Sequence, residues 1–471
     1  MRLSTASLIR FCRAPRALFL TLALAWPGTA GAIPAFARKY GMSCSACHEA
    51  WPKLSDQGIA FRDNGYQWGT GKDSPIKLDP TYWPIALRST VGYQYSSLTN
   101  QATNGGPATV HSGRIGYTGV DLLMAGTLTH DVSFLAVLEP FLTNAGLAPN
   151  ANGAIASPGE TGLMESLWVR FDNLLATSWL NFKLGRGALD LPFDEHRSLT
   201  VLTPFDIYHY HPGGSANSMP FAVGENQFQA TLEGHNAGSS TRYAVGLIQT
   251  QDDPGSALVL SSPGVYAHVQ HSFYPPAGPV PEIRAGLLAM AGSYPTMALY
   301  SGGPAGTPAF GPLQNPDGTQ APIVPNTAYG LREFYREGAD LSVYLGNLSL
   351  PVNLEIAYVA GQEDPAFISG ATREALFHGG FVEADWTPLL NLSFAARWDT
   401  RRNLRQGDPS QPANFLAADG ATAVVRYTFE FVPRTEVALH AEVSYQHIAG
   451  AGAGGADTES LLGFGGVDFA F

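Results

Sequence analysis

The apolar residues of this chain are dispersed, and this constrains its fold more than any other feature. The composition is 45% hydrophobic and 11% aromatic, yet nothing after residue 32 provides the roughly eighteen consecutive apolar residues that a transmembrane helix needs. With 52 glycines and 34 prolines along the chain, the composition predicts many strands and turns rather than helices. The apolar residues are therefore expected at alternating positions.

Several stretches show this alternation directly. Val352 and Ile356 fall on one face of a predicted strand, while Glu355 falls on the other. The same pattern recurs over 390–399 and 436–446. Each strand therefore has one apolar face and one polar face.

A soluble β-sandwich would also alternate, so the connections must distinguish the two folds. The predicted strands are 84–95, 110–124, 130–141, 162–172, 179–187, 225–234, 239–250, 263–273, 282–293, 335–348, 350–361, 374–387, 390–402, 421–432, 434–448 and 456–471. Long connections such as 96–109 and 188–224 alternate with short ones such as 125–129. Long outer loops and short periplasmic turns are typical of bacterial outer-membrane barrels. We therefore predict an all-β fold, an antiparallel outer-membrane barrel of about sixteen strands over residues 84–471.

The end of the chain agrees with a barrel. Val467, Phe469 and Phe471 alternate with other residues, and the sequence stops on phenylalanine, which resembles the terminal strand of bacterial outer-membrane proteins. A large periplasmic all-β protein is the alternative.

The first 32 residues have the features of a secretory signal peptide. Four arginines precede the apolar run 17–26, and Ala30-Gly31-Ala32 fits a small-residue cleavage site. The run is too short to span a bilayer, so we predict a mature chain that begins at Ile33, with a retained anchor as the alternative. Removal of the four arginines would change the formal charge from −12 for the full chain to about −16 for the mature chain. Such an acidic protein is not expected to bind nucleic acid.

Cys44-Ser45-Ala46-Cys47-His48 contains the two cysteines that remain after export. Thiols at this spacing can form thioethers to the two vinyl groups of haem, and the adjacent histidine can then bind the iron. A structural zinc site needs about four ligands, and a redox dithiol is expected near a βαβ pattern. The motif therefore predicts one covalent haem c, and a chance or disulfide-bonded pair is the alternative.

Residues 33–83 are too few for a self-sufficient domain and are expected to plug the barrel lumen. A short helix is predicted over 52–63. Leu54, Gly58 and Phe61 would share one of its faces, which suits either packing on a porphyrin or an ordinary core.

The stretch from Pro34 to Gln67, PAFARKYGMSCSACHEAWPKLSDQGIAFRDNGYQ, resembles the N-terminal signature of the outer-membrane monohaem cytochrome–porin fusions. The best-known members of that family are the iron-oxidising cytochromes of iron bacteria. By this resemblance, Cys44 and Cys47 hold the haem and His48 is its axial ligand. The resemblance also implies electron transfer across the outer membrane between periplasmic cytochromes and an extracellular donor or acceptor, such as Fe(II).

The sixth iron ligand is left open. Residues 49–110 contain neither histidine nor methionine, and Met42 is too close to Cys44 to reach the opposite haem face. The candidates on the barrel are His111, Met164 and His196. The alternatives are a lysine as the sixth ligand or an iron without a sixth ligand from the protein.

The long connection 188–224 gathers several metal-capable side chains between the fifth and sixth predicted strands, where porins often fold a loop into the lumen. They are Asp194, Glu195, His196, His209 and His211. A constriction that admits iron or contacts the haem fits this composition. A polar loop whose histidines bond to carboxylates of the wall is the preferred interpretation.

The sequence therefore predicts an outer-membrane electron-transfer protein, an Fe(II) oxidase only in the broad sense. Its haem segment is expected on the periplasmic side or within the lumen, with membrane lipid around the barrel. A solute-diffusion porin whose haem-bearing segment is a plug or redox sensor is the main alternative, and haem enzymology is the third. A lumen filled by residues 33–83 would oppose the porin, whereas an unobstructed lumen would favour it.

Overall fold

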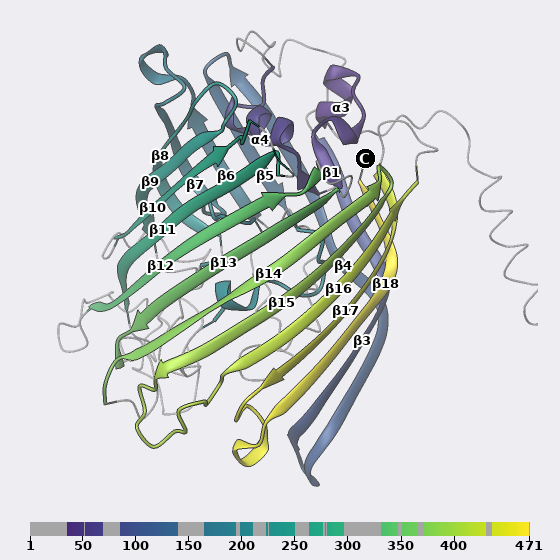
Figure 1. Cartoon of the computed structure of the whole chain (residues 1–471), viewed down its shortest axis with the longest axis vertical. Coiled ribbons are helices and arrows are strands. Elements are labelled where there is room, and N and C mark those ends of the chain that lie inside the picture. Colours follow the sequence, from purple (N-terminus) through teal and green to yellow (C-terminus); the bar gives the residue numbers. More distant parts are fainter. Residues whose placement is uncertain are drawn as a thin grey trace, which may run out of the picture.

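The computed structural model describes residues 35–50, 52–68, 85–139, 164–194, 198–210, 223–224, 226–249, 263–276, 278, 280–295, 331–346, 351–365, 372–429 and 436–470. These residues form one closed barrel, with a small N-terminal segment at one of its ends (Figure 1). We call residues 35–68 the N-terminal segment.

Sixteen antiparallel strands form the barrel wall, each paired with its neighbours in sequence, and β18 pairs with β3 to close it. They are β3 (Ile85–Thr103), β4 (Gly106–Thr129), β5 (Val132–Leu138), β6 (Met164–Phe171), β7 (Asn181–Gly187), β8 (Gln227–His235), β9 (Thr241–Gln249), β10 (Pro263–Phe273), β11 (Glu282–Pro295), β12 (Leu331–Tyr344), β13 (Val352–Glu363), β14 (Ala375–Leu389), β15 (Leu392–Arg405), β16 (Ala418–Thr428), β17 (Glu436–Ile448) and β18 (Thr458–Ala470). Every predicted strand has a counterpart here. The predicted sixteen-strand barrel is confirmed.

Short and long connections lie at opposite ends of the barrel. The end that holds the start of β3 and the finish of β18 carries short turns, such as 130–131 between β4 and β5. The opposite end carries the long connections, such as 188–226 between β7 and β8. This division is that of an outer-membrane barrel, with the short turns on the periplasmic side.

The first connection differs from the prediction. A loop over 96–109 was expected, but β3 continues to Thr103 and β4 begins at Gly106, and these two residues are paired. Asn104 and Gly105 form the turn between them. Asn-Gly is a strong signal for a two-residue hairpin turn. Polar residues can continue the paired strands beyond the membrane, where both faces meet water.

The predicted faces of the strands are confirmed. On β17, Leu439 and Val443 are about half exposed on the outside, whereas His440 and Glu442 are buried on the inside. A closed barrel has no open edge, and an apolar exterior suits lipid. The protein is therefore a porin-like outer-membrane β-barrel.

The N-terminal segment consists of short elements. They are α3 (Ala35–Tyr40), the 3-10 turn η1 (Cys44–Ala46), β1 (His48–Ala50), β2 (Lys53–Leu54) and α4 (Asp56–Asp63). Ser55 caps α4 by accepting a hydrogen bond from Gly58 N at 3.3 Å, and β2 pairs with β1, so the helix predicted from residue 52 begins later. None of the described helices has the length and apolar character needed to cross a membrane.

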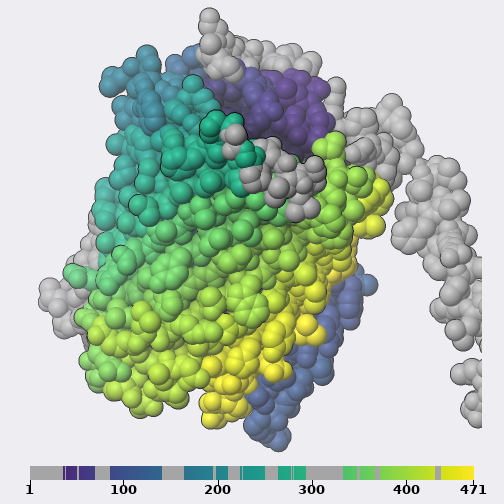
Figure 2. All heavy atoms as spheres, in the orientation of Figure 1, coloured from purple at the N-terminus to yellow at the C-terminus, as the bar shows by residue number. Residues whose placement is uncertain are grey.

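The N-terminal segment sits in the periplasmic mouth of the barrel (Figure 2). Its anchors are Lys53 with Glu355 and Asp385, Asp56 with Arg284, Asp63 with Arg242, and the carbonyls of Arg62 and Asp63 with Arg170. These partners extend around the wall from β6 to β14. The segment is therefore fixed across the mouth.

A second segment fills part of the lumen. Residues 188–194 and 198–210, which we call the lumen segment, follow β7 and contact the opposite wall. Glu442 accepts hydrogen bonds from Val201 N at 2.6 Å and from Thr203 Oγ1 at 2.8 Å. Asp206 accepts one from Arg401 at 2.7 Å. The described part of this connection therefore runs into the lumen.

Candidate functional site

The two cysteines lie on one tight turn in the N-terminal segment. Cys47 N donates to Cys44 O at 3.1 Å across η1. Both cysteines are half-buried, neither is in a disulfide, and both line the same cavity. The local fold therefore presents two thiols, neither in a disulfide, to one cavity.

His48 is held by the short hairpin that follows. The pairing of His48 with Leu54 folds the chain back, and His48 Nδ1 lies 3.1 Å from the carbonyl oxygen of Pro52. A carbonyl can only accept, so Nδ1 carries the proton and Nε2 carries the lone pair. This is the tautomer that a metal-binding histidine adopts when it bonds a carbonyl through Nδ1.

The cavity beside these residues has a volume of about 520 Å³, within the roughly 300–1,000 Å³ range of ligand pockets. Leu54 of β2 lines it together with Gly58 and Phe61 of α4. Leu54 is therefore not on the helix where the sequence placed it. Trp168 of the barrel wall lines it too, and its ring stacks on that of Tyr66 with centroids 6.2 Å apart. The N-terminal segment and the barrel thus enclose the cavity together.

Gly58 allows α4 to approach the cysteine turn closely. A Cβ at this position would lie 2.1 Å from the carbonyl oxygen of Cys47. The same carbonyl accepts a hydrogen bond from Ser55 N at 2.9 Å. Only glycine fits here without moving the backbone that carries Cys47.

The surroundings of the thiols do not suit a redox dithiol. Burial, with a smaller effect from Glu436, raises the pKa of Cys44 to about 12, and burial also raises the pKa of Cys47. Thiol–disulfide exchange needs a thiolate, which a low pKa favours. The raised thiol pKa values therefore disfavour a redox dithiol.

A zinc clip is also disfavoured. Two groups of three metal-capable side chains occur among the described residues. They are Asp121, Glu139 and Glu165, and Glu355, Glu383 and Asp385. Neither group contains a cysteine or His48, so the described part of the chain supplies no four-ligand zinc site around the thiols.

Two of the candidate sixth ligands are wrong. His111 lies towards the β3–β4 hairpin, at the other end of the barrel, where Nδ1 contacts Tyr95 Oη at 3.1 Å. Met164 is exposed at the start of β6, and neither residue lines the cavity. His196 lies outside the described residues.

The predicted loop cluster is only partly described. Asp194 lines the cavity, whereas His209 follows the 3-10 turn η5 (Asp206–Tyr208) and does not line it. Glu195, His196 and His211 lie outside the described residues. Among the residues that are described, the structure does not bring this cluster together at the cavity.

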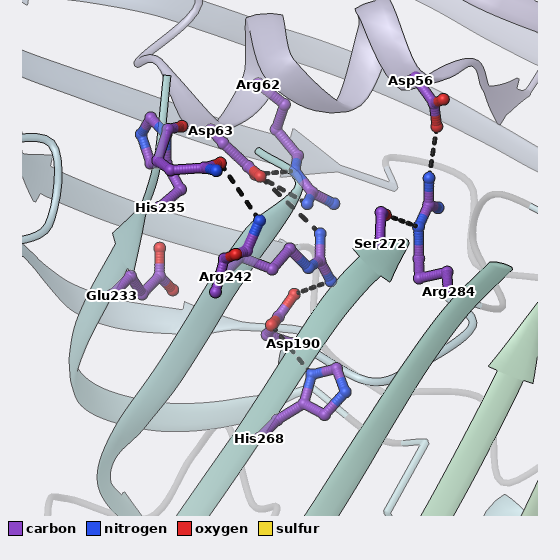
Figure 3. Close-up of polar contacts among 12 residues, drawn as sticks. Asp56, Arg62, Asp63, Asp190, Glu233, His235, Arg242, His268, Ser272 and Arg284 are labelled. Carbon is purple, nitrogen blue, oxygen red and sulfur yellow. Dashed lines mark hydrogen bonds and ion pairs between the residues drawn. The ribbon is translucent and has the colours of Figure 1, made fainter. Parts of the chain in front are cut away.

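Arg242 connects the N-terminal segment to the lumen segment (Figure 3). It lies 3.9 Å from Asp63 and 2.6 Å from Asp190, and Asp190 also contacts His268 Nδ1 at 3.1 Å. Burial alone would raise the pKa of Asp63, but Arg62 and Arg242 outweigh it and lower that pKa to about 2. Asp63 therefore stays ionised in its contact with the wall.

Sequence reasoning missed three residues of this site. Pro52 contributes the carbonyl that contacts His48, and Trp168 lines the cavity. Lys53 forms ion pairs with residues about 300 positions away in the chain. The only signal for Pro52 was its position four residues after His48. The other two depend on which strands face the segment, and a single sequence does not reveal that.

The sequence matches no protein-family model and no curated protein. Among solved structures it is similar to an anion-selective porin from Comamonas acidovorans, with 12% identity, a TM-score of 0.46, and coverage of 82% of this chain and 99% of that one. It is also similar to the outer-membrane channel DcaP of Acinetobacter baumannii, with 11% identity, a TM-score of 0.45, and coverage of 82% and 97%. Such distant similarity says nothing about solutes or partners, which depend on the site.

Proposed function

We propose that this protein is an outer-membrane cytochrome–barrel fusion that passes single electrons between periplasmic carriers and a donor or acceptor outside the cell. Cys44 and Cys47 bind haem c through thioethers, and His48 is an axial ligand. When bound, haem c supplies a one-electron redox centre. The contact between His48 Nδ1 and Pro52 O, beside a cavity that both cysteines line, is the observation that carries the proposal.

The residues around the cavity have separate roles. Pro52 O orients the imidazole of His48, and Gly58 lets α4 close against the cysteine turn. Phe61 and Trp168 are buried and give the cavity part of its apolar lining. Burial and the polarity of the surroundings are among the means by which a protein sets the potential of a bound redox group.

The two segments inside the barrel support electron transfer over free diffusion. The N-terminal segment lies across the periplasmic mouth, and the lumen segment packs its apolar side chains against the inner wall. Phe205, Ile207 and Tyr208 are each almost fully buried there. These packed side chains narrow the path available to a solute, whereas an electron needs no open path.

A solute-diffusion porin is the second candidate, and the barrel itself favours it. Barrels of 16–18 strands leave an aqueous channel in porins. Buried inward-facing charges such as Glu355, Arg397 and Arg426 line this wall, as in a polar channel. In this function the N-terminal segment acts as a plug or a redox sensor.

The experiment uses the full chain, matured with a haem-attachment system and placed in proteoliposomes that contain a trapped electron acceptor. We expect covalent haem, low ionic conductance and electron transfer from an external one-electron donor. The matched control carries Cys44→Ala and Cys47→Ala and should not transfer electrons. High conductance with equal electron transfer by both proteins would overturn the proposal and favour the porin.

A further inference from the structure

Lys53 is a buried cation that the N-terminal segment inserts into the barrel wall. Its Nζ lies 2.5 Å from Glu355 Oε1 on β13 and also bonds to Asp385 Oδ2 on β14. The side chain of Lys53 is 12% exposed and that of Asp385 is 3% exposed. Glu383 belongs to the same group, in which carboxylate oxygens lie within 4.8 Å of one another.

This ion pair is costly to break. Burial alone would lower the pKa of Lys53, but Asp385 and Glu355 outweigh it and raise that pKa well above its usual value. Removing one partner of a buried pair leaves an uncompensated charge, which is strongly destabilising. Lys53 therefore holds β2 firmly against β13 and β14.

The ion pair is one residue away from the group that orients His48. Pro52 O contacts His48 Nδ1, and Lys53 follows Pro52 directly. The pairing of Ala50 with Lys53, and of His48 with Leu54, ties the same residues into the hairpin. A shift of Lys53 thus moves the carbonyl that sets the tautomer and ring orientation of His48.

We propose that Lys53 is the positioning residue through which the barrel wall orients His48. The carboxylates of Glu355 and Asp385 fix Lys53, Lys53 fixes the peptide of Pro52, and Pro52 O fixes the imidazole. Partners of this indirect kind keep a ligating histidine in one tautomer and one orientation. The inference rests on the proposed function, because it concerns the predicted axial ligand.

Asp56 provides a matched control. It belongs to the same segment and also contacts the wall, through Arg284 on β11 (Figure 3). It lies at the start of α4, on the far side of Ser55 from Pro52, and its side chain is 52% exposed. Asp56→Asn therefore weakens an anchor of the segment without touching the hairpin that holds His48.

The test reads His48 directly, in two forms of the full-length protein. In the haem-free Cys44→Ala, Cys47→Ala protein, nitrogen NMR of the imidazole should show protonation at Nδ1, and Lys53→Met should shift it towards a mixture of tautomers. In the haem-loaded protein, resonance Raman spectra should show a lower iron–histidine stretching frequency in Lys53→Met. Lys53→Arg should restore both signals, and Asp56→Asn should leave both unchanged.

The double variant Glu355→Gln, Asp385→Asn tests the contact between Lys53 and the barrel from the barrel side. It replaces Lys53→Met if that variant does not assemble. The same shifts are expected, because Lys53 then loses both anchors. Unchanged His48 signals in these variants, or an equal change in Asp56→Asn, would overturn the inference. A wild-type protein without covalent haem would instead overturn the proposed function, and the NMR measurement would still decide the role of Lys53.

Discussion

Phe205 of the lumen segment stacks on Phe381 of β14, with ring centroids 4.0 Å apart and planes 9° from parallel. The guanidinium carbon of Arg397 lies 4.7 Å from the centroid of the Phe205 ring. Arg397 also donates to the carbonyl oxygens of Thr203 and Pro204, at 2.8 and 3.0 Å. One wall arginine thus fixes both the ring and the backbone of the lumen segment, which keeps the segment inside the barrel.

Opening this contact should raise the ionic conductance of the barrel. Phe205→Ala removes a buried aromatic ring, which typically costs about 3–5 kcal/mol, and leaves space beside Phe381. We expect single-channel conductance in planar bilayers to increase several-fold over the unmodified protein. Val443→Ala, on the outer face, is the control and should leave the conductance unchanged. Equal conductance in all three proteins would mean that the lumen segment does not limit permeation.

Covalent haem should depend on both cysteines. Cys44→Ala with Cys47→Ala should abolish haem-stained peroxidase activity on a denaturing gel, because no thioether can form. His48→Ala should keep some stain but change the absorption spectrum, since the iron bond is separate from the thioethers. Ser45→Ala, in the same turn, should behave like the wild type. Staining that survives loss of both thiols would contradict the assignment.

A charge on the outer face should impair the barrel in the membrane. Val443 is about half exposed near the middle of β17, and Val443→Arg should destabilise the barrel by about 2–4 kcal/mol if the residue is near the bilayer midplane. Val443→Leu at the same position should be tolerated. Heat-modifiable mobility on gels and unfolding in urea from lipid vesicles measure the effect. Equal stability of the two variants would show that this face does not contact lipid.

Acid should loosen the N-terminal segment before it unfolds the barrel. Despite burial, the pKa of Asp63 is lowered from 3.8 to about 2, first by Arg62 of the same segment and then by Arg242 of the wall, so the part due to Arg242 stabilises the docked segment above pH 3.8. This contribution is lost as the pH falls from 3.8 to about 2. Limited proteolysis with an acid-active protease should cut the segment increasingly over this range. Asp63→Asn should abolish that pH dependence, and an unchanged profile in the variant would contradict the role of Asp63.

The barrel was predictable because each strand carries its own signal. Residues 436–446 alternate strictly, and the structure buries His440 and Glu442 while exposing Leu439. This two-residue alternation can be read from one strand alone, without knowing which strand pairs with it. The extension of β3 and β4 was missed because its side chains are polar on both faces, although Asn104-Gly105 was a readable turn.

The candidate site was only partly predictable. Cys44, Cys47 and His48 form a local motif, so the cavity they line could be expected around them. The contacts of Lys53 with Glu355 and Asp385 join residues about 300 positions apart, and no local pattern encodes them. His111 and Met164 were poor ligand candidates because strand register, which sets their height in the barrel, is a property of the closed sheet.

The seam between β3 and β18 sets an order of events during biogenesis. The cysteine turn precedes every strand of the wall in the chain, whereas the wall closes only when its last strand pairs with its first. After closure, the periplasmic mouth is covered by the segment that carries the thiols. A group joined to Cys44 and Cys47 is therefore expected to be attached before the N-terminal segment docks across the mouth, so that docking covers a group that is already bound.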